Sequence, residues 1–300
     1  MATALERYLE EYLNYLEIEK NRSPHTRENY EHYLRQFLQF AKVTTPTQIT
    51  DGVIRNFRLD LARRDLKKVS QSYYVIALRN FLKYLAKRDV KVIAPEKIEL
   101  PRVPSRQIEV LEPQDLERLL ASTKKSKTLR DLRDQAILET FFSTGLRLAE
   151  LCALERYLDL ERGEVTVRGK GDKLRVVFLS DRAKLAIKEY LAKRTDAEPT
   201  LFVSLAKNGT RALGPITSRA VQRLMQTRAT AAGIGKKIHP HQLRHAFATD
   251  LLINGADLRS VQELLGHANI ATTQIYTHIT NKELKEIHQA FHGRRRKLKN

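Results

Sequence analysis

The stretch that decides the fold runs from His239 to Ile279 and reads HPHQLRHAFATDLLINGADLRSVQELLGHANIATTQIYTHI. A proline opens a predicted helix that carries His241 and Arg244 one helical turn apart. A second predicted helix ends at Gly266-His267, where glycine suits the left-handed cap of a helix. Tyr276 follows nine residues later. Cations and a phenol without a metal-binding carboxylate suit attack on a phosphodiester.

The composition of the chain points to a polyanionic partner. Its 300 residues include 54 Lys and Arg against 35 Asp and Glu, giving a formal charge of +19 and a sequence pI of about 10.0. Acidic membranes attract such a charge too, but no apolar run approaches the ~20 residues of a spanning helix, and the charged N-terminus is unlike a signal peptide. The single cysteine, Cys152, fits a reducing compartment. We expect about two domains with real cores, a cytoplasmic location and no membrane partner.

The positive charge is concentrated in one part of the chain. Residues 1–50 carry 6 basic and 7 acidic side chains, whereas residues 55–91 carry 11 and 3, a net charge of +8. This basic stretch is either a solvated helical face or a surface that contacts DNA phosphates, and the chemistry described below favours the second. The residues expected to contact DNA are Arg79, Lys83 and Lys87.

The first part of the chain is predicted to be helical. Apolar residues recur at helical spacing over residues 5–16. Ser23-Pro24 has the form of an N-cap followed by a proline in the first turn, and a further helix is expected from about Ser70. Beyond it the periodicity fails and three prolines occur. We therefore expect a domain over residues 1–94 and a linker over residues 95–108.

The following residues, 109–292, are predicted to form a second domain. A mostly buried helix over residues 131–143 ends near Gly145. The segments EVTVR and LRVVFL flank the loop Gly169-Lys170-Gly171-Asp172 and predict a β-hairpin. The rest of this domain is expected to be helical, and a basic tail covers residues 293–300.

Arg147 is a candidate phosphate ligand. It follows Thr144-Gly145, where one predicted helix ends and another begins, so its side chain would start from a helix N-terminus, where anions are favoured. A phosphodiester gains negative charge during attack, and an always-charged guanidinium binds two of its oxygens at once. The alternative is an ordinary surface pair with Glu150, three residues later.

His241 and Arg244 supply further candidate donors. A metal site made by His241 and His245 is the competing interpretation, because the two are four residues apart on a helix. However, Gln242 stands where a metalloprotease helix has glutamate, and no third ligand is evident, so we expect no metal. His267 follows the cap glycine, and its alternative role is to satisfy the last helix carbonyls.

Tyr276 and Lys170 are the candidate nucleophile and acid. A free phenol has a pKa near 10, but a cationic pocket lowers the cost of the phenolate and a neutral histidine can take its proton. Attack by Tyr276 would need no ATP or other cofactor; the alternative is a packed core tyrosine. Lys170, at a hairpin tip between glycines, suits a general acid because desolvation beside other cations lowers the pKa of a lysine. Its alternative is an exposed turn lysine, and Lys173 is the weaker candidate for the acid.

Together, STGLRLAEL around Arg147, VRGKGDKLRVV around Lys170 and the stretch 239–279 closely resemble the tyrosine recombinases, and among them the Xer group. The resemblance covers nearly the whole chain. It implies a mainly helical, two-domain fold, with a SAM-like core-binding domain and a mixed α/β catalytic domain that has a small antiparallel sheet. It implies a supporting role for Glu150. The catalytic residues that it implies are Arg147, Lys170, His241, Arg244, His267 and Tyr276.

The resemblance also implies an activity and partners. Enzymes of this kind cleave and rejoin strands of double-stranded DNA through a 3′-phosphotyrosine, and four protomers exchange strands at paired half-sites through a Holliday junction. We expect a homo-tetramer, or a hetero-tetramer with a paralogue, that resolves chromosome dimers, with a DNA translocase as a candidate activator. Apolar residues at i, i+3 and i+7 predict an amphipathic helix over residues 281–292. The resemblance implies that it docks on a neighbouring protomer; the alternative is packing on its own domain.

Three other functions compete with this interpretation. A phage or transposon integrase would use the same chemistry on mobile DNA. A type IB topoisomerase would use similar residues to relax DNA, although the contexts GLRLAEL and HPHQLRHAFAT argue against it. A DNA-binding regulator without catalysis would not need Tyr276 together with two arginines.

Overall fold

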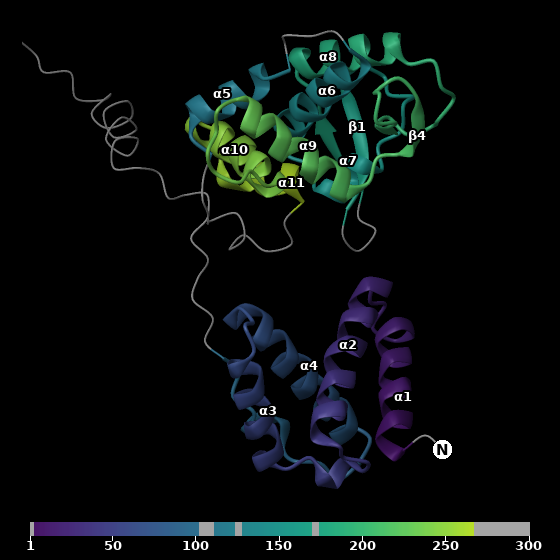
Figure 1. Cartoon of the computed structure of the whole chain (residues 1–300), viewed down its shortest axis with the longest axis vertical. Helices are drawn as coiled ribbons and strands as arrows, with labels where there is room; N and C mark the ends of the chain where they lie inside the picture. Colours follow the sequence, from purple (N-terminus) through teal and green to yellow (C-terminus); the bar gives the residue numbers. More distant parts are fainter. Residues whose placement is uncertain (1–2, 102–110, 124–127, 170–173, 267–300) are drawn as a thin grey trace, which may run out of the picture. The chain divides into compact units, whose positions relative to one another are not determined.

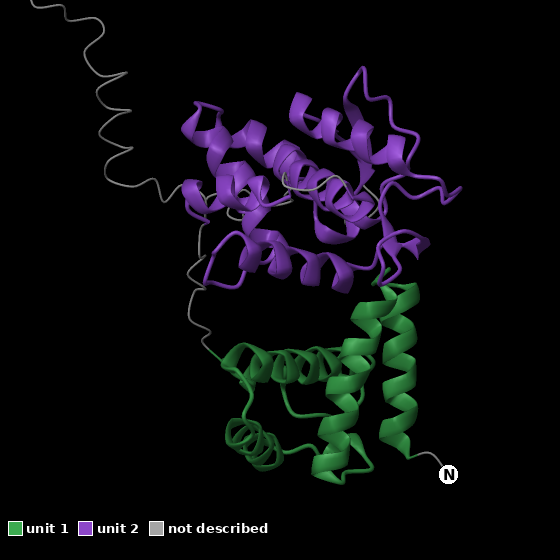
Figure 2. Ribbon diagram, turned by 45° about the horizontal axis from the view of Figure 1, so that its top comes forward, with its two compact units in different colours: residues 1–107 green, residues 108–300 purple. Residues whose placement is uncertain are grey.

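The computed structural model describes residues 3–101, 111–123, 128–169 and 174–266. By its internal contacts the chain divides into two compact units, residues 1–107 and 108–300, which Figure 2 shows in different colours. Each unit has its own large hydrophobic core. Each unit is therefore stabilised by a core of its own.

Helices build the described part of the first unit. Hydroxyl groups of Thr3, Ser23 and Thr50 accept hydrogen bonds from first-turn backbone N–H groups and so start three of these helices. The cap at Ser23, followed by Pro24, confirms the start predicted from the sequence. The elements are α1 (Ala4–Ile18), α2 (Pro24–Ala41), the 3-10 turn η1 (Pro46–Gln48), α3 (Asp51–Arg63), α4 (Lys68–Ala86) and the 3-10 turn η2 (Pro95–Lys97) (Figure 1).

Aromatic side chains fill much of the first core. The Tyr12 ring centroid lies 5.4 Å from that of Phe81 and 5.0 Å from that of Tyr84. Phe37 and Phe57 meet edge to face at 5.2 Å. Burial raises the pKa of Tyr12, so its hydroxyl stays neutral. This unit is held together mainly by apolar and aromatic packing.

The start of the expected linker packs on the first unit. Pro95 is buried in η2, and Ile98 is only 3% exposed and joins the first core. The carbonyl oxygen of Pro95 accepts a hydrogen bond from Nε of Arg79 at 3.1 Å. An apolar residue after the turn thus keeps the chain against α4 beyond residue 94.

The second unit is built around α6, which is buried along most of its length. Ala136, Ile137, Leu138 and Phe141 on this helix are fully buried. Helices α8 and α10 pack directly against it. In the part of this unit that the structure describes, the helices are α5 (Pro113–Ala121), α6 (Leu129–Thr144), α7 (Leu148–Cys152), α8 (Asp181–Lys193), α9 (Ser218–Ala231), α10 (Pro240–Ile253) and α11 (Leu258–Leu265) (Figure 1).

The described part of the second unit also contains two small antiparallel sheets. The predicted hairpin is present: β1 (Glu164–Arg168) pairs with β2 (Leu174–Phe178), with Val165 opposite Val177. The expectation that the rest of this domain is helical was wrong at one place, because β3 (Val203–Leu205) pairs with β4 (Ala212–Pro215). These strands are too short to show a two-residue alternation in the sequence. The predicted fold class, mainly helical with a little antiparallel sheet, is confirmed.

The single cysteine is a half-buried core group. Cys152 ends α7 and packs against the second core, where burial raises the pKa of its thiol. Among the described residues, no helix is both long enough and apolar enough to cross a membrane.

Candidate active site

Three arginines converge on the carboxyl end of α11. The last carbonyl groups of a helix lack intrahelical partners and carry partial negative charge, so they attract cations. Here three consecutive carbonyl oxygens each accept a hydrogen bond from a different guanidinium group, one from β2, one from α10 and one from the residue before α7. The pairs and their distances are Arg175 to Leu264 (3.1 Å), Arg244 to Leu265 (2.6 Å) and Arg147 to Gly266 (3.2 Å).

Gly145 allows the close packing beside this cluster. It caps α6 in the left-handed conformation, with φ at 58°, and its carbonyl oxygen accepts from Nη1 of Arg244 at 2.6 Å. A Cβ atom at Gly145 would lie 2.3 Å from Cδ1 of Phe247 on α10, well inside van der Waals contact. Only glycine combines this backbone angle with that approach. The turn that delivers Arg147 is thereby fixed against α10.

The carboxylate of Glu150 links two of the arginines. Its Oε1 accepts from Nη1 of Arg147 and from Nη1 of Arg175, both at 2.9 Å. Its Oε2 accepts from the backbone N–H of Arg147 and from Nη2 of Arg175, both at 2.7 Å. Burial alone would raise the pKa of Glu150, but the hydrogen bonds and charges of Arg175 and Arg147 outweigh it and lower the pKa to about 2. Glu150 therefore stays ionised at neutral pH.

The two arginines predicted from the sequence differ in exposure. Arg244 is 4% exposed, whereas the side chain of Arg147 is 31% exposed. The surface pair with Glu150 proposed as the alternative role of Arg147 exists, but its carboxylate is 6% exposed. The site thus combines a buried guanidinium with one that solvent reaches. Such an arrangement is suited to binding an anionic group with phosphate-like geometry.

The two histidines of α10 lie in different environments. His241, in the first turn of this helix, is exposed, whereas His245 is partly buried. Burial, with smaller contributions from the neighbouring His241 and Arg244, lowers the pKa of His245 to about 4. His245 is therefore neutral at pH 7. No group of three or more metal-ligating side chains occurs among the described residues.

Several predicted site residues fall outside the described residues. Lys170, His267 and Tyr276 are among them, as is the predicted helix over residues 281–292. The described chain reaches Gly169 on one side of Lys170. It ends at Gly266, directly before His267.

Arg175 is a residue of this site that the sequence interpretation missed. It lies on β2, whose alternate residues Leu174 and Val176 are exposed, while Val177 is buried. In a strand, residues two apart share a face, so Arg175 lies on the same face as Val177. An arginine on the buried face of a short hairpin was the available signal, because such a charge needs a partner.

The basic residues predicted to contact DNA lie along α4 and its C-terminus. Nε of Arg79 is hydrogen-bonded to Pro95, and Nζ of Lys83 lies 3.8 Å from Oε1 of Glu96. Lys83 and Lys87 line a pocket of about 230 Å³ together with several tyrosines of the first core. The side chain of Lys83 is 45% exposed.

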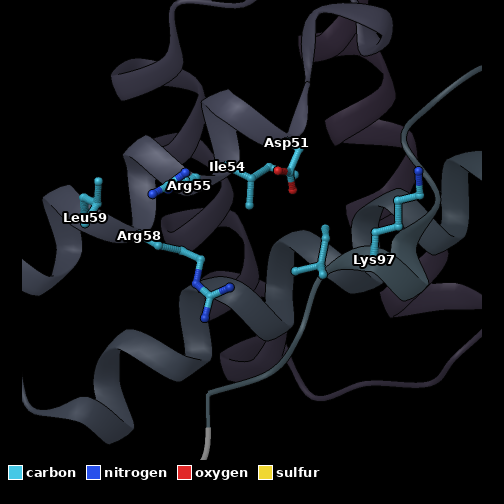
Figure 3. A pocket seen from close by; sticks show the side chains of 7 residues that line it. Asp51, Ile54, Arg55, Arg58, Leu59 and Lys97 are labelled. Atoms are coloured by element: carbon cyan, nitrogen blue, oxygen red, sulfur yellow. The ribbon is translucent and has the colours of Figure 1, made fainter.

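A second basic pocket of the first unit lies between α3 and η2. It has a volume of about 370 Å³ and includes Arg55, Arg58 and Lys97 around Ile54. Figure 3 shows Arg55 and Arg58 on one side of this pocket and Lys97 on the other. Part of the net charge of the stretch 55–91 is therefore gathered here rather than along α4.

Comparison with known proteins identifies the class. Residues 109–283 match the model of the phage integrase family, and residues 9–89 match that of the phage integrase N-terminal SAM-like domain. The chain therefore belongs to the phage integrase family. It is a tyrosine recombinase, as the resemblance read from the sequence predicted, and its first unit contains the expected SAM-like domain.

Individual relatives resemble the chain over nearly its full length. The tyrosine recombinase XerC of Haemophilus influenzae strain PittEE is 38% identical over 307 residues, which is 100% of both chains. XerD of Listeria monocytogenes serotype 4b strain F2365 is 39% identical over 301 residues, covering 95% of this chain and 98% of the relative. A post-cleavage crystal structure of the XerH site-specific recombinase bound to its palindromic difH substrate superimposes with a TM-score of 0.70 at 25% identity. That match covers 94% of this chain and 83% of XerH.

Proposed function

We propose that this protein is a site-specific recombinase that cleaves and rejoins duplex DNA through a 3′-phosphotyrosine intermediate. The observation that carries the proposal is the convergence of Arg147 and Arg244 on adjacent carbonyl groups at the end of α11. The full-length similarity to XerC and XerD supports it, as does the net charge of +19.

The arginines and histidines act on the scissile phosphate in this proposal. Arg147 and Arg244 bind its non-bridging oxygens and stabilise the charge that builds up during attack. His241 and His267 donate further hydrogen bonds. Glu150 supports the site by fixing the orientation of Arg147, to which it is hydrogen-bonded through both the side chain and the backbone.

Tyr276 and Lys170 carry the proposed bond changes. The phenolic oxygen of Tyr276 loses its proton to a neutral histidine and attacks phosphorus, forming the phosphotyrosine ester. The bond from phosphorus to the 5′ oxygen breaks, and that oxygen takes a proton from Lys170. The ester retains the energy of the phosphodiester, so the reverse attack by a 5′ hydroxyl rejoins the strand without ATP.

Strand exchange needs more than one active site, so we propose a tetramer on two DNA molecules with paired half-sites. In each copy the helix predicted over residues 281–292 would dock on a neighbouring copy. Strand exchange would pass through a Holliday junction. The tetramer contains this chain alone or this chain with a paralogue. The full-length similarity to XerC and XerD favours chromosome dimer resolution over phage or transposon integration, with a DNA translocase as candidate activator. Within the chain we propose a core-binding domain over residues 1–94, a linker over 95–108 whose first residues pack on that domain, and a catalytic domain over 109–292, with a basic tail over 293–300.

A suicide substrate tests the chemistry. In a duplex nicked beside the cleavage site, cleavage releases a short fragment that carries the 5′ hydroxyl. The reverse attack then lacks its nucleophile, so the covalent adduct is trapped. We expect the wild-type protein and Tyr157→Phe to form the adduct, because Tyr157 is 79% exposed and lies outside the proposed machinery. Tyr276→Phe should bind DNA with unchanged affinity and form none. An adduct of undiminished yield in Tyr276→Phe contradicts the nucleophile.

The same preparation separates the competing functions. Recombinant products from two paired sites identify a recombinase. Relaxation of supercoiled DNA without recombinants identifies a type IB topoisomerase. Binding without any adduct identifies a DNA-binding regulator.

A further inference from the structure

We propose that Arg175 is a positioning residue for the reaction. By binding both Glu150 and the end of α11, it keeps Arg147 oriented toward the scissile phosphate. The inference rests on the function proposed above. It assigns a role to a side chain on β2 that does not itself touch the reacting atoms.

Arg175 binds the carboxylate of Glu150 with both of its terminal nitrogens. Nη1 and Nη2 of Arg175 donate to the two carboxylate oxygens at 2.9 and 2.7 Å, a bidentate geometry that fixes the carboxylate plane. The remaining acceptor positions of Glu150 hold the side chain and the backbone N–H of Arg147. The orientation of Arg147 is thus set by a carboxylate that Arg175 holds still.

Arg175 also changes the net charge of the group that contains Arg147 and Glu150. Glu150 alone would pair with Arg147 one to one, and that pair would carry no net charge. Arg175 supplies a second cation to the same carboxylate, so the group of three keeps a net charge of +1. Since Arg147 is the more exposed of the two arginines, the excess charge is presented on the solvent side of the site. A phosphate is attracted to such a group and not to a neutral pair.

Arg175 also contacts the end of α11. Nε of Arg175 donates to the carbonyl oxygen of Leu264 at 3.1 Å. Its aliphatic part lies so close to Gly266 that a Cβ atom there would stand 3.0 Å from Cδ of Arg175. One side chain therefore joins β2, α7 and the turn from which the chain continues to His267.

Lysine cannot reproduce these contacts. Its ammonium group is a single point of charge, whereas Arg175 uses two parallel N–H donors toward Glu150 and a third toward Leu264. Arg175→Lys therefore keeps the charge and loses the geometry. Arg194→Lys is a matched control, because Arg194 also pairs with a carboxylate, Asp196, and donates to backbone carbonyls while its side chain is fully buried after the last turn of α8.

The experiment measures three quantities on the full-length wild-type, Arg175→Lys and Arg194→Lys proteins: Tm, Kd for a single half-site, and the single-turnover rate of adduct formation at saturating protein. We expect both variants to melt within a few degrees of each other and to bind with wild-type affinity. Only Arg175→Lys should cleave slowly, by on the order of 100-fold, because small misplacement of a catalytic group has effects of that size. A rate within twofold of Arg194→Lys overturns the inference, as does a loss of binding or a Tm far below that of the control.

A second substrate decides through which group Arg175 acts. A 5′-bridging sulfur leaves without protonation, so it rescues a variant that lacks the acid, as we expect for Lys170→Ala. Arg175→Lys should remain slow on this substrate, because it is Arg147 that is displaced. Rescue of Arg175→Lys would place its effect on the hairpin that carries Lys170 and overturn the assignment to Arg147. If the wild-type protein forms no adduct at all, the proposed function itself fails.

Discussion

The two units of this protein bury different kinds of side chain. Apart from tyrosines, the only buried polar residue in the described part of the first unit is Ser72, whereas the second unit buries both carboxylates and guanidinium groups. A buried charge is costly unless it is paired and hydrogen-bonded. Among its described residues, the buried charged ones are Arg133, Asp134, Glu139, Arg194 and Arg244.

Within the second unit, some buried arginines contribute to stability and others to the chemistry of the site. Arg133 and Arg194 form ion pairs with the neighbouring carboxylates of Asp134 and Asp196. Arg244 donates to the backbone carbonyls of Gly145 and Leu265, each at the end of a helix. Burial of an arginine is thus no mark of function by itself; its position at converging helix ends is the more informative feature.

The largest effect on stability is expected in the first unit. Phe81 is 1% exposed beside Tyr12, and Phe81→Ala should reduce the free energy of unfolding by about 3–5 kcal/mol. The control Tyr73→Ala, at a half-exposed ring, should cost less than about 1 kcal/mol. Urea unfolding followed by circular dichroism measures both. Equal losses would show that aromatic packing does not dominate this core.

Two buried arginines of the second unit should respond in different ways. Arg244→Ala should slow adduct formation by roughly a hundred- to thousandfold while half-site binding persists. Arg194→Ala should leave the rate per folded molecule unchanged and lower the free energy of unfolding by about 1–3 kcal/mol, because the partly buried Asp196 loses its partner. Single-turnover rates and urea unfolding on both variants distinguish these outcomes. If both variants slow adduct formation by the same factor, Arg244 has no special role in the reaction.

The second unit should also be the more sensitive to acid. Burial lowers the pKa of His245 from 6.5 to about 4, so between these values the unfolded chain binds a proton that the folded chain does not. This contribution to stability is complete above pH 6.5 and is lost as the pH falls toward 4, by at most about 1.4 kcal/mol per pH unit. Glu150 adds a separate loss between pH 4.5 and about 2. Tm measured at pH 7 and pH 5 should fall less in His245→Gln than in the wild type, while the exposed His25→Gln should behave as wild type.

The smallest effect concerns the surface of the first unit. Because Arg79 is hydrogen-bonded to Pro95, Lys83 and Lys87 are the better probes of DNA phosphate binding. Replacing both with glutamine should reduce the slope of log affinity against log salt by about 0.9 for each phosphate that the protein no longer neutralises. Replacing the exposed Lys188 and Lys193 of α8 removes the same charge and serves as the control. An unchanged slope for the α4 variant would show that this side of α4 is an ordinary solvated surface.

Local signals in the sequence predicted much of the fold. Ser23-Pro24 and Pro240 gave helix starts, and Gly145 and Gly266 gave helix ends. Each of these signals acts through backbone angles or hydrogen bonds within one turn, so a single sequence contains them. The hairpin of β1 and β2 was predicted for the same reason, whereas the shorter pair β3 and β4 was not.

The site was less accessible to sequence reasoning where it depends on tertiary contacts. The spacing of His241 and Arg244 shows that they share a helix, but not that Arg244 is buried while His241 is exposed. Arg175 lies 25 residues from Glu150 and 89 from Leu264, and no local pattern joins such positions. The apolar neighbours of Arg175 also concealed it, because Leu174 and Val176 make the strand hydrophobic on its exposed face.

Because the thiol of Cys152 is half-buried, the distance between the two units can be followed with fluorescent dyes on introduced cysteines. It is the only cysteine of the chain, and burial raises its pKa, so little of it is in the reactive thiolate form at pH 7. A cysteine introduced at exposed Lys42 in the first unit and another at Lys188 in the second would react with a maleimide dye far faster than Cys152. Energy transfer between such a pair of dyes would follow the distance between the units as DNA is added, with the native cysteine left in place.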